Sequence, residues 1–210
     1  MRMMQTENAA EAVLFTNASD LLDAVERALA ERGHLLLAID GRCGCGKSSL
    51  AEVLARELDG NVFHTDDFYL PFSRRAHDWR TQLAGNMNLT RLREEVLTPL
   101  LAEETVYYRA YDCPRDCFMP TREIPFKALS VVEGSYSQHP LLADAYDRRI
   151  FVTAEKTVQL HRLREREGAH AASFEKLWIP MEEHYFKAFA IEQKADWLLR
   201  TDSPEWNWIP

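Results

Sequence analysis

The segment "LLLAIDGRCGCGKSSLAEVLA", residues 35–55, decides how this chain folds. It opens with an apolar run typical of a buried strand and closes with apolar residues at helical spacing. Between them, residues 41–48 match the pattern G-x-x-x-x-G-K-[ST] of a phosphate-binding loop, or P-loop. Because the motif lies between a predicted strand and a predicted helix, as its mechanism requires, the sequence predicts a nucleoside triphosphate site with ATP as ligand.

The residue types of this loop suit phosphate binding. Glycines let successive backbone N–H groups turn inward as a nest for an anion, and the following helix adds its positive N-terminal end. We expect Lys47 to reach the β- and γ-phosphates and the Ser48 hydroxyl to bind Mg²⁺. The predicted nucleotide-binding residues are Gly41, Arg42, Cys43, Gly44, Cys45, Gly46, Lys47, Ser48 and Ser49.

The rest of the chain alternates between strand and helix patterns, which predicts an α/β fold with a parallel sheet covered on both faces. Together with the P-loop, this pattern predicts a P-loop NTPase that forms a three-layer sandwich with a five-stranded parallel sheet. The nucleoside/nucleotide kinase type and an Arg-bearing helical lid are what the family resemblance of the motifs below implies. Residues 1–210 form a single domain in this prediction, with its core at about 34–201 and its lid at about 162–175. The predicted strands are 34–40, 61–65, 128–133, 149–154 and 196–201.

The predicted helices cover residues 19–33, 47–58, 88–104, 140–147, 155–167 and 173–194. Residues 105–112 are expected to be extended, as half of a hairpin, and the proline-containing segment 112–126 to be loop or turn. Residues 70–87 carry charges and aromatics without a clean period. Two tryptophans in the tail, Trp206 and Trp208, suit either a covered hydrophobic edge or a dimer contact, so homo-oligomerisation is left open.

Composition and charge narrow the partners. The net charge of -8 disfavours binding of nucleic acid or anionic lipid by the bulk surface, so the expected partner is a small molecule. No apolar run approaches the ~18 residues that span a bilayer, and residues 1–15 lack the apolar core of a signal peptide. Four cysteines make no disulfide scaffold, which favours a reducing, cytoplasmic setting. In the loop, Cys43 and Cys45 are expected to be small fillers or, alternatively, redox-sensitive thiols.

Acidic residues end two of the predicted strands. Asp66 and Asp67 lie in "FHTDDFYLP" and Glu133 in "SVVEGSY". Because the carboxyl ends of parallel strands face the ligand crevice, Asp66 could accept a proton from an attacking hydroxyl or bind Mg²⁺, and Glu133 could bind Mg²⁺. Asp67 is equally explained as a turn-capping residue. The predicted metal-binding residues are Ser48, Glu133 and Asp66.

These motifs together resemble one family. In order and spacing, "DGRCGCGKSS", "TDDFYLP", "VVEGSYSQHP" and an Arg-rich helix resemble the uridine kinase and phosphoribulokinase-like group of P-loop kinases, from about residue 34 to 200. The resemblance implies an ATP- and Mg²⁺-dependent phosphotransferase in which Asp66 is the catalytic base and Tyr69 lines the acceptor pocket. By the same resemblance, Tyr111 and Asp112 match a tyrosine-aspartate stretch beside the nucleoside base. The substrate-binding residues are then Asp66, Tyr69, Tyr111, Asp112 and Glu133.

The acceptor side of the motif set departs from uridine kinases. Where their tyrosine-aspartate stretch continues to a histidine, "YDCPRDCF" offers Arg115 and Asp116, and "AHDWRTQLAGNMN" only loosely matches their aspartate-rich segment. A uridine- or cytidine-like nucleoside is the expected acceptor, with another riboside such as nicotinamide riboside, or pantothenate, as alternatives. A nucleotide-dependent ATPase that regulates a protein partner is the alternative from another functional class.

The helix "LHRLRERE" suggests a lid. Arg162 and Arg166 lie four residues apart on one helical face, with Arg164 turned away. In the kinase interpretation Arg162 and Arg166 join Lys47 and Asp66 as catalytic residues, because a closing lid can stabilise the transferring phosphoryl group. The alternative is a solvated helix with internal Arg–Glu pairs. The histidines, His64 among them, form no ligand-like cluster and are expected to be structural or exposed.

Overall fold

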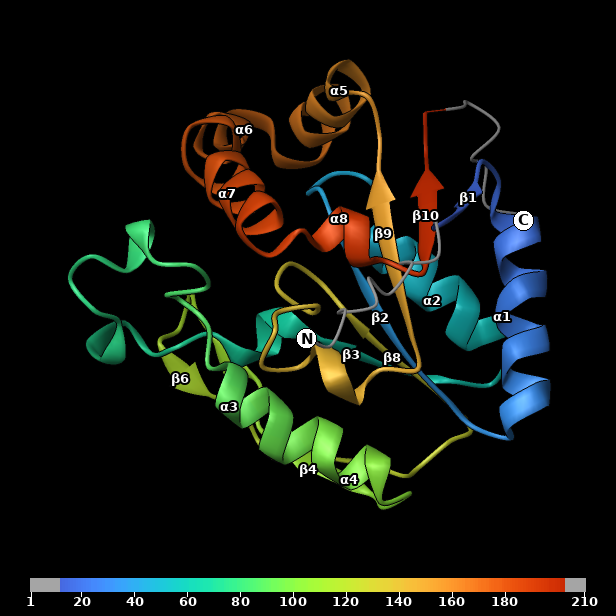
Figure 1. Ribbon diagram of the computed structural model, residues 1–210. Helices are drawn as coiled ribbons and strands as arrows, with labels where there is room; N and C mark the ends of the chain where they lie inside the picture. Colours follow the sequence, from blue (N-terminus) through green and yellow to red (C-terminus); the bar gives the residue numbers. More distant parts are fainter. Residues whose placement is uncertain (1–11, 203–210) are drawn as a thin grey trace, which may run out of the picture.

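A six-stranded, all-parallel sheet forms the centre of the computed structural model, which describes residues 12–202 (Figure 1). The strand order is β1-β10-β9-β2-β8-β3. Its strands are β1 (Val13–Phe15), β2 (Leu35–Gly41), β3 (Asn61–His64), β8 (Leu129–Glu133), β9 (Arg148–Thr153) and β10 (Trp197–Arg200). The five predicted strands are confirmed, and the predicted number is corrected from five to six by β1.

The extra strand, β1, gives a weak sequence signal for a physical reason. It is three residues long and lies at the sheet edge, where it pairs with β10 alone. Two of its apolar side chains, Val13 and Leu14, are more than half exposed, so no alternation marks a buried face.

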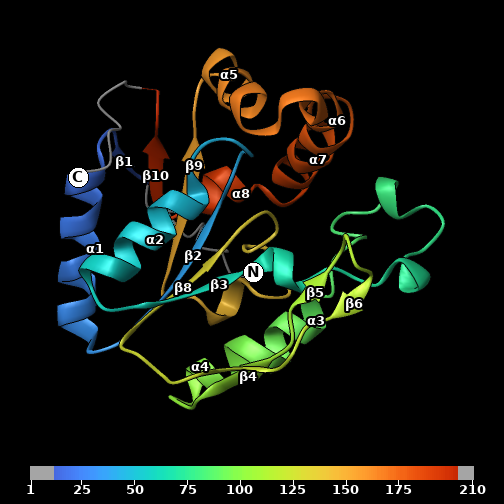
Figure 2. The same cartoon turned by 180° about the vertical axis from the view of Figure 1, so that it is seen from behind.

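Helices cover both faces of the sheet (Figures 1 and 2). The helices are α1 (Ala18–Arg32), α2 (Lys47–Glu57), α3 (Leu89–Leu92), α4 (Thr98–Leu101), α5 (Lys156–Glu167), α6 (Ala171–Ser173), α7 (Ile179–Phe189) and α8 (Ile191–Lys194). Side chains alternate along β2: Leu35 and Leu37 join the apolar cluster under α1 and α2, whereas Leu36 joins the cluster under α3, α4 and α7. This alternation produces the three predicted layers.

Several connecting segments differ from the sequence predictions. The helix predicted at 140–147 is reduced to one 3₁₀ turn at Ala143–Ala145, and the helix predicted at 173–194 is divided by a left-handed residue, Ala190, with φ 52°. The predicted hairpin is present as two nested strand pairs (Figure 2). These pairs are β4 (Val106–Tyr108) with β7 (Arg122–Ile124), and β5 (Tyr111–Asp112) with β6 (Cys117–Phe118), so the segment 112–126 is not loop throughout.

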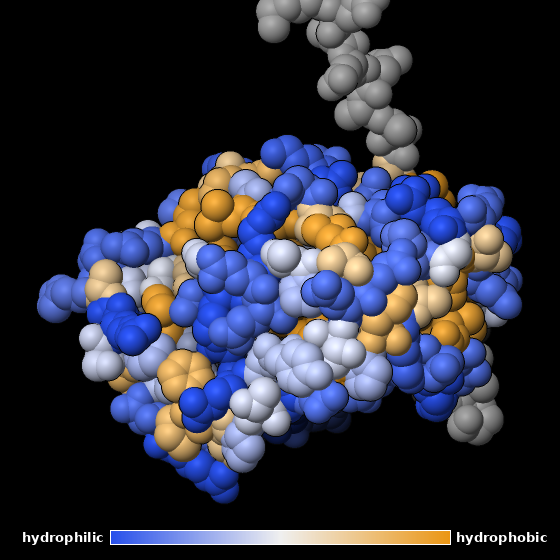
Figure 3. All heavy atoms as spheres, turned by 90° about the horizontal axis from the view of Figure 1, so that it is seen from below, coloured by the Kyte–Doolittle hydropathy of each residue, from blue (hydrophilic) through white to orange (hydrophobic). Residues whose placement is uncertain are grey.

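The surface is mixed. The face in Figure 3 is mostly hydrophilic, with apolar side chains in patches between the polar ones. Within residues 12–202, no helix is long and apolar enough to cross a membrane. Trp206 and Trp208, as well as the N-terminal segment 1–11, lie outside the described residues.

The chain turns from β2 into the P-loop at Gly41, where the backbone leaves no room for a side chain. Gly41 has φ 133°, and a Cβ there would lie 2.0 Å from the backbone oxygen of Val152 on β9. Glycine is therefore required both by the backbone angle and by the close approach of the neighbouring strand.

We predict that Gly41→Ala lowers the free energy of unfolding by about 3 kcal/mol or more, because the new methyl group must push two backbone segments apart. The matched control is Gly33→Ala at the end of α1, where φ is 79° but no atom lies within 4 Å of the added Cβ. That variant should lose only about 1 kcal/mol. Urea unfolding of both variants measures the difference, and equal losses would contradict the steric argument.

Candidate active site

The P-loop lies at the carboxyl end of β2, between the ends of β8 and β9. The helix α2 begins at Lys47, with Gly46 in a left-handed conformation (φ 91°) as its N-cap. β8 ends in Glu133, and β3 leads into a 3₁₀ turn, Thr65–Phe68, that carries Asp66. The parallel sheet thus places the motif and both acids at one edge, as the sequence predicted.

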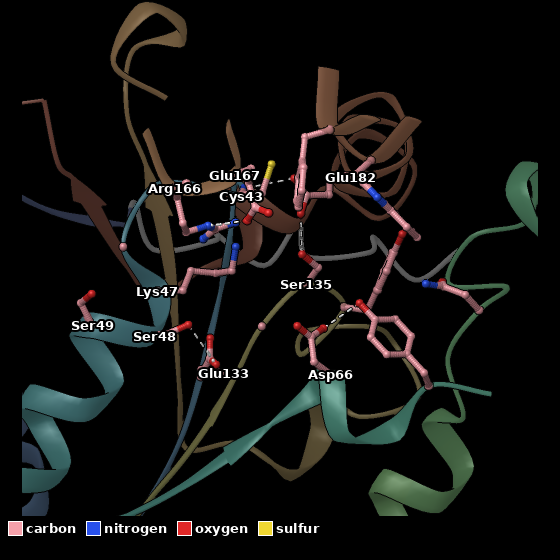
Figure 4. Close-up of a pocket in the computed structure, with 18 residues that line it drawn as sticks. Cys43, Lys47, Ser48, Ser49, Asp66, Glu133, Ser135, Arg166, Glu167 and Glu182 are labelled. Carbon is pink, nitrogen blue, oxygen red and sulfur yellow. Dashed lines mark hydrogen bonds and ion pairs between the residues drawn. The ribbon is translucent and has the colours of Figure 1, made fainter. Parts of the chain in front are cut away.

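A cavity of about 520 Å³ opens in front of the loop (Figure 4). Figure 4 shows Lys47, Ser48 and Glu133 on one side of it and Asp66 on the other. The lining consists of P-loop residues, strand-end acids, aromatic side chains and lid residues: Cys43, Gly44, Gly46, Lys47, Ser48, Ser49, Asp66, Tyr69, Asn86, Glu133, Gly134, Ser135, Tyr136, Arg166, Glu167, Phe174, Trp178 and Glu182.

Lys47 is held inside the loop. Its Nζ donates a hydrogen bond to the Gly41 carbonyl oxygen at 2.7 Å, and the side chain is buried. Burial lowers the pKa of Lys47, but the nearby carboxylates, led by Glu182 and Asp40, raise it further, and the net pKa is raised. The loop therefore contains a permanent ammonium group where an anion would be bound.

Ser48, Glu133 and His64 form a chain of contacts. The Ser48 hydroxyl donates to Glu133 Oε1 at 3.2 Å, and His64 Nδ1 lies 2.5 Å from the same oxygen. The hydrogen bond to Glu133 raises the pKa of His64. A hydroxyl and a carboxylate that already converge suit Mg²⁺, which takes one or two protein oxygens and completes its shell with water and phosphate.

His64 was expected to be structural or exposed, and it is partly exposed and does not line the larger cavity. In the structure it ends β3 directly opposite Glu133 in the register of the parallel sheet. The signal was present in the alignment of the two predicted strands, because the residue before the Thr-Asp-Asp turn faces the last residue of β8.

Asp66 faces the cavity, and its neighbour Asp67 does not. Asp66 Oδ1 accepts a hydrogen bond from the Tyr69 hydroxyl at 2.8 Å, and shielding by the surrounding protein raises the pKa of Asp66. A carboxylate with a raised pKa is a better proton acceptor. Asp67 accepts hydrogen bonds from the hydroxyl of Tyr108 (2.8 Å) and from Arg122 (2.6 Å), and so ties the turn to the β4-β7 strand pair.

Glu182 is the main site residue that sequence reasoning did not find. It comes from α7, is 5% exposed, and accepts hydrogen bonds from the Cys43 backbone N–H at 3.1 Å and from the Ser135 hydroxyl at 2.5 Å (Figure 4). Glu182 thus brings a further carboxylate to the cavity from α7, in contact with the P-loop itself.

The lid arginines occupy different positions. Arg162 donates to the side-chain and backbone oxygens of Thr201, at 2.9 and 2.7 Å, and lines a second cavity of about 290 Å³ beside Gly46 and Ser49. Arg166 lines both cavities, with its Nε 2.7 Å from Glu167. Arg164 lines neither and bonds to Glu175, as its place on the helix predicts.

Other residues named from the sequence lie outside the larger cavity. Tyr111 donates to Asp116, and Asp112 accepts from the Arg115 backbone N–H at 3.0 Å. Neither Tyr111 nor Asp112 lines the larger cavity. Arg42 points away from the nest, with Nε 2.6 Å from Glu183.

The loop thiols behave as fillers. Burial raises the pKa of Cys45 to about 11, and burial followed by the charge of Glu182 raises that of Cys43. Cys45 belongs to the apolar cluster under α1 and α2. Because the thiolate is disfavoured at both positions, the structure supports the filler interpretation over the redox-sensitive one.

Solved structures resemble this fold, whereas no protein-family model and no curated protein matches the chain. A protein from Bacillus stearothermophilus described as a possible uridine kinase is 19% identical, with a TM-score of 0.66 over 86% of this chain and 98% of that one. A provisionally assigned fructose transport system kinase from Silicibacter sp. TM1040 is 22% identical, with a TM-score of 0.68 over 87% and 98%. These likenesses show that the chain has the P-loop kinase fold.

Beneath the loop, Asp40 at the end of β2 is completely buried. Its Oδ1 accepts a hydrogen bond from the Gly41 N–H (2.8 Å), and its Oδ2 accepts hydrogen bonds from the Gln138 N–H (3.1 Å) and the Tyr185 hydroxyl (2.8 Å). Burial raises the pKa of Asp40 to about 6, while Lys47 and these hydrogen bonds lower it. Since the folded-state pKa lies above the ordinary value of 3.8, the contribution of this group to stability is complete below pH 3.8 and is lost as the pH rises through about 6.

We predict that Tyr185→Phe destabilises the fold by about 2 kcal/mol at pH 8 and by about 1 kcal/mol at pH 5. The hydroxyl stabilises the charged carboxylate more than the neutral acid, so its removal raises the pKa of Asp40 further and costs most where Asp40 is ionised. Urea unfolding at the two pH values measures this. Tyr107→Phe is the control, because that hydroxyl bonds to Glu123 at the surface. Equal losses at both pH values would argue against the linkage to Asp40.

Proposed function

We propose that this chain is an ATP-dependent small-molecule kinase similar to uridine kinases, which transfers the γ-phosphoryl group to a hydroxyl of a nucleoside or related riboside. The observation that carries the proposal is the single cavity shared by Lys47, the Ser48–Glu133 pair and Asp66. Such a cavity combines a phosphate nest, ligands for a metal and a proton acceptor, which are the groups that phosphoryl transfer to a hydroxyl needs.

Each group has a defined part in this proposal. Lys47 and the amides at the start of α2 hold the β- and γ-phosphates. Ser48 and Glu133 are placed to bind Mg²⁺, which when bound neutralises phosphate charge. Asp66 accepts the proton of the acceptor hydroxyl, and the Tyr69 hydroxyl orients its carboxylate. Positioning and charge stabilisation supply most of the acceleration.

The lid arginines take unequal parts. Arg166 borders both cavities and is placed to stabilise charge on the phosphoryl group as it moves. Arg162 is held by Thr201 beside the smaller cavity, on the nucleotide side of the loop, so its part is to shape the nucleotide site and position the lid.

Two cavities that meet at the P-loop favour a kinase over a regulatory ATPase. The larger contains Asp66 and aromatic walls, and the smaller lies between the loop, α5 and the end of β10. A kinase requires separate places for donor and acceptor, whereas hydrolysis alone requires only water beside the phosphates. The two structural neighbours named above as kinases also carry small-molecule names, a nucleoside in one case and a fructose transport system in the other.

The direct test is ADP release by purified protein with Mg-ATP and a panel of uridine, cytidine, nicotinamide riboside and pantothenate. Stimulation by one or more ribosides supports the proposal. Stimulation by pantothenate alone would keep the kinase and change the acceptor. ATP hydrolysis that none of these compounds raises, but that a protein partner raises, would favour the regulatory ATPase.

We predict that Asp66→Asn lowers kcat by about 10²- to 10⁴-fold while ATP affinity is unchanged, because the general base is lost and the phosphate nest is intact. Since the pKa of Asp66 is raised above its ordinary 3.8, activity of the unmodified enzyme should fall on the acid side at a pH above that value. Steady-state kinetics across pH measures both effects.

Asp67→Asn is the matched control, since Asp67 bonds to the β4-β7 strand pair and does not line the cavity. It should lower thermal stability while kcat stays within a few-fold of the original. A turnover by Asp66→Asn similar to that of Asp67→Asn would remove Asp66 from the mechanism.

A further inference from the structure

Glu182 has no assigned role in the proposed phosphoryl transfer, yet it faces the same cavity, and its charge helps to raise the pKa of Lys47. The carboxylate is nearly buried, and among residues 12–202 its hydrogen bonds come from a backbone N–H and a serine hydroxyl, with no arginine or lysine in salt-bridge contact. It lies across the cavity from Asp66 (Figure 4). A buried carboxylate can accept more hydrogen bonds than these two, so a ligand that donates hydrogen bonds would be favoured beside Glu182.

Asn86 independently contributes a hydrogen-bond acceptor without a partner. It lines the cavity, is 1% exposed, and its side-chain oxygen has no hydrogen-bond partner within the described part of the chain. A buried amide oxygen without a partner costs free energy. The oxygen is closed off in the free protein, so a bound donor would recover this cost once the side-chain amide turns toward the cavity. Asn86 lies in the segment "AHDWRTQLAGNMN", which only loosely matches the aspartate-rich segment of uridine kinases.

The charges around the cavity restrict the ligand further. Of the described residues that line it, only Lys47 and Arg166 are cationic, and both lie on the phosphate side. Four carboxylates line the cavity as well, and because Glu133 bonds to Ser48 and Glu167 to Arg166, Asp66 and Glu182 are left to face an acceptor. An anionic group on the acceptor would face two carboxylates and the phosphates of ATP with no cation left to bind it.

Aromatic rings complete this side of the cavity. Tyr69, Tyr136 and Trp178 line it, and such rings pack against sugar and base faces and also attract cations. The walls therefore accept a flat or apolar surface, while Asp66 and Glu182 supply hydrogen-bond acceptors.

We propose that Glu182 and Asn86 form the acceptor-recognition subsite, and that it selects a polyhydroxylated or amino-bearing compound without an anionic group. The inference rests on the proposed function and narrows it. It favours neutral nucleosides and cationic ribosides, and it excludes carboxylated acceptors such as pantothenate.

The test uses two pairs of compounds that differ by one carboxylate: uridine with orotidine, and nicotinamide riboside with nicotinic acid riboside. We measure kcat/KM for each, together with binding by calorimetry in the presence of a non-hydrolysable ATP analogue. The full chain should prefer the compound without the carboxylate by at least about tenfold in each pair, because like charges in a desolvated site are strongly unfavourable.

Two variants assign the effect to the subsite. Glu182→Gln keeps the shape but removes the charge, and should reduce the preference within each pair by at least about fivefold. Asn86→Ala should raise acceptor KM about tenfold with ATP affinity unchanged, since an acceptor for the ligand's donor is lost. Glu175→Gln, whose partner is Arg164 outside the cavity, is the control and should change neither quantity. Thermal unfolding verifies that each variant is folded.

The outcomes separate the two proposals. Equal kcat/KM within the pairs, or a preference that Glu182→Gln leaves unchanged, would overturn the subsite and leave the kinase standing. Tight ATP binding with neither binding nor turnover of any of the four compounds would overturn the proposed riboside kinase and the subsite with it.

Discussion

One buried carboxylate holds the site together. Asp40 accepts hydrogen bonds from the first amide of the P-loop, from the segment after β8 and from the Tyr185 hydroxyl on α7. An isolated carboxylate in this position would be strongly unfavourable, and its three donors together with the nearby charge of Lys47 make it tolerable. Because the three donors come from different elements, their hydrogen bonds to Asp40 fix the positions of the P-loop, of the segment after β8 and of α7 relative to one another.

The lid is coupled to the loop at Cys43. Gln159 on α5 donates to the Cys43 carbonyl at 2.9 Å, and Glu182 on α7 accepts its N–H at 3.1 Å. The carbonyl of Cys43 is therefore bonded to a side chain of α5, and its N–H to a side chain of α7. In the proposed kinase, a phosphate oxygen that accepts the same N–H would compete with Glu182, which would link nucleotide binding to the orientation of this carboxylate through a single backbone amide.

Site residues could be predicted from the sequence where a local motif or a strand end determines their position. Lys47 and Ser48 belong to a contiguous motif, and Asp66 and Glu133 end strands whose carboxyl ends must meet, so their convergence was predictable. Glu182 was not, because it depends on the rotation of α7 against the sheet. Its neighbour Glu183 points to Arg42 instead, and nothing in "WIPMEEHYF" says which glutamate enters the cavity. Asn86 lies in an irregular segment whose position depends on long-range contacts such as the Leu70 N–H to the Asn86 carbonyl.

The residues that the sequence predicts and those that it does not predict also differ in their proposed roles. The groups proposed for phosphoryl transfer lie at or just beyond strand ends, where the hydrogen-bonded register of the sheet keeps their spacing constant. The groups proposed to face the acceptor come from an irregular segment and from α7, where a substitution changes the lining without disturbing the sheet. The same fold at 19% and 22% identity bears the names of a nucleoside kinase and a sugar-transport kinase, so the fold alone does not determine the acceptor. For this chain the proposed acceptor preference rests on the charge of the cavity, where carboxylates outnumber the two cations, Lys47 and Arg166, among the described lining residues.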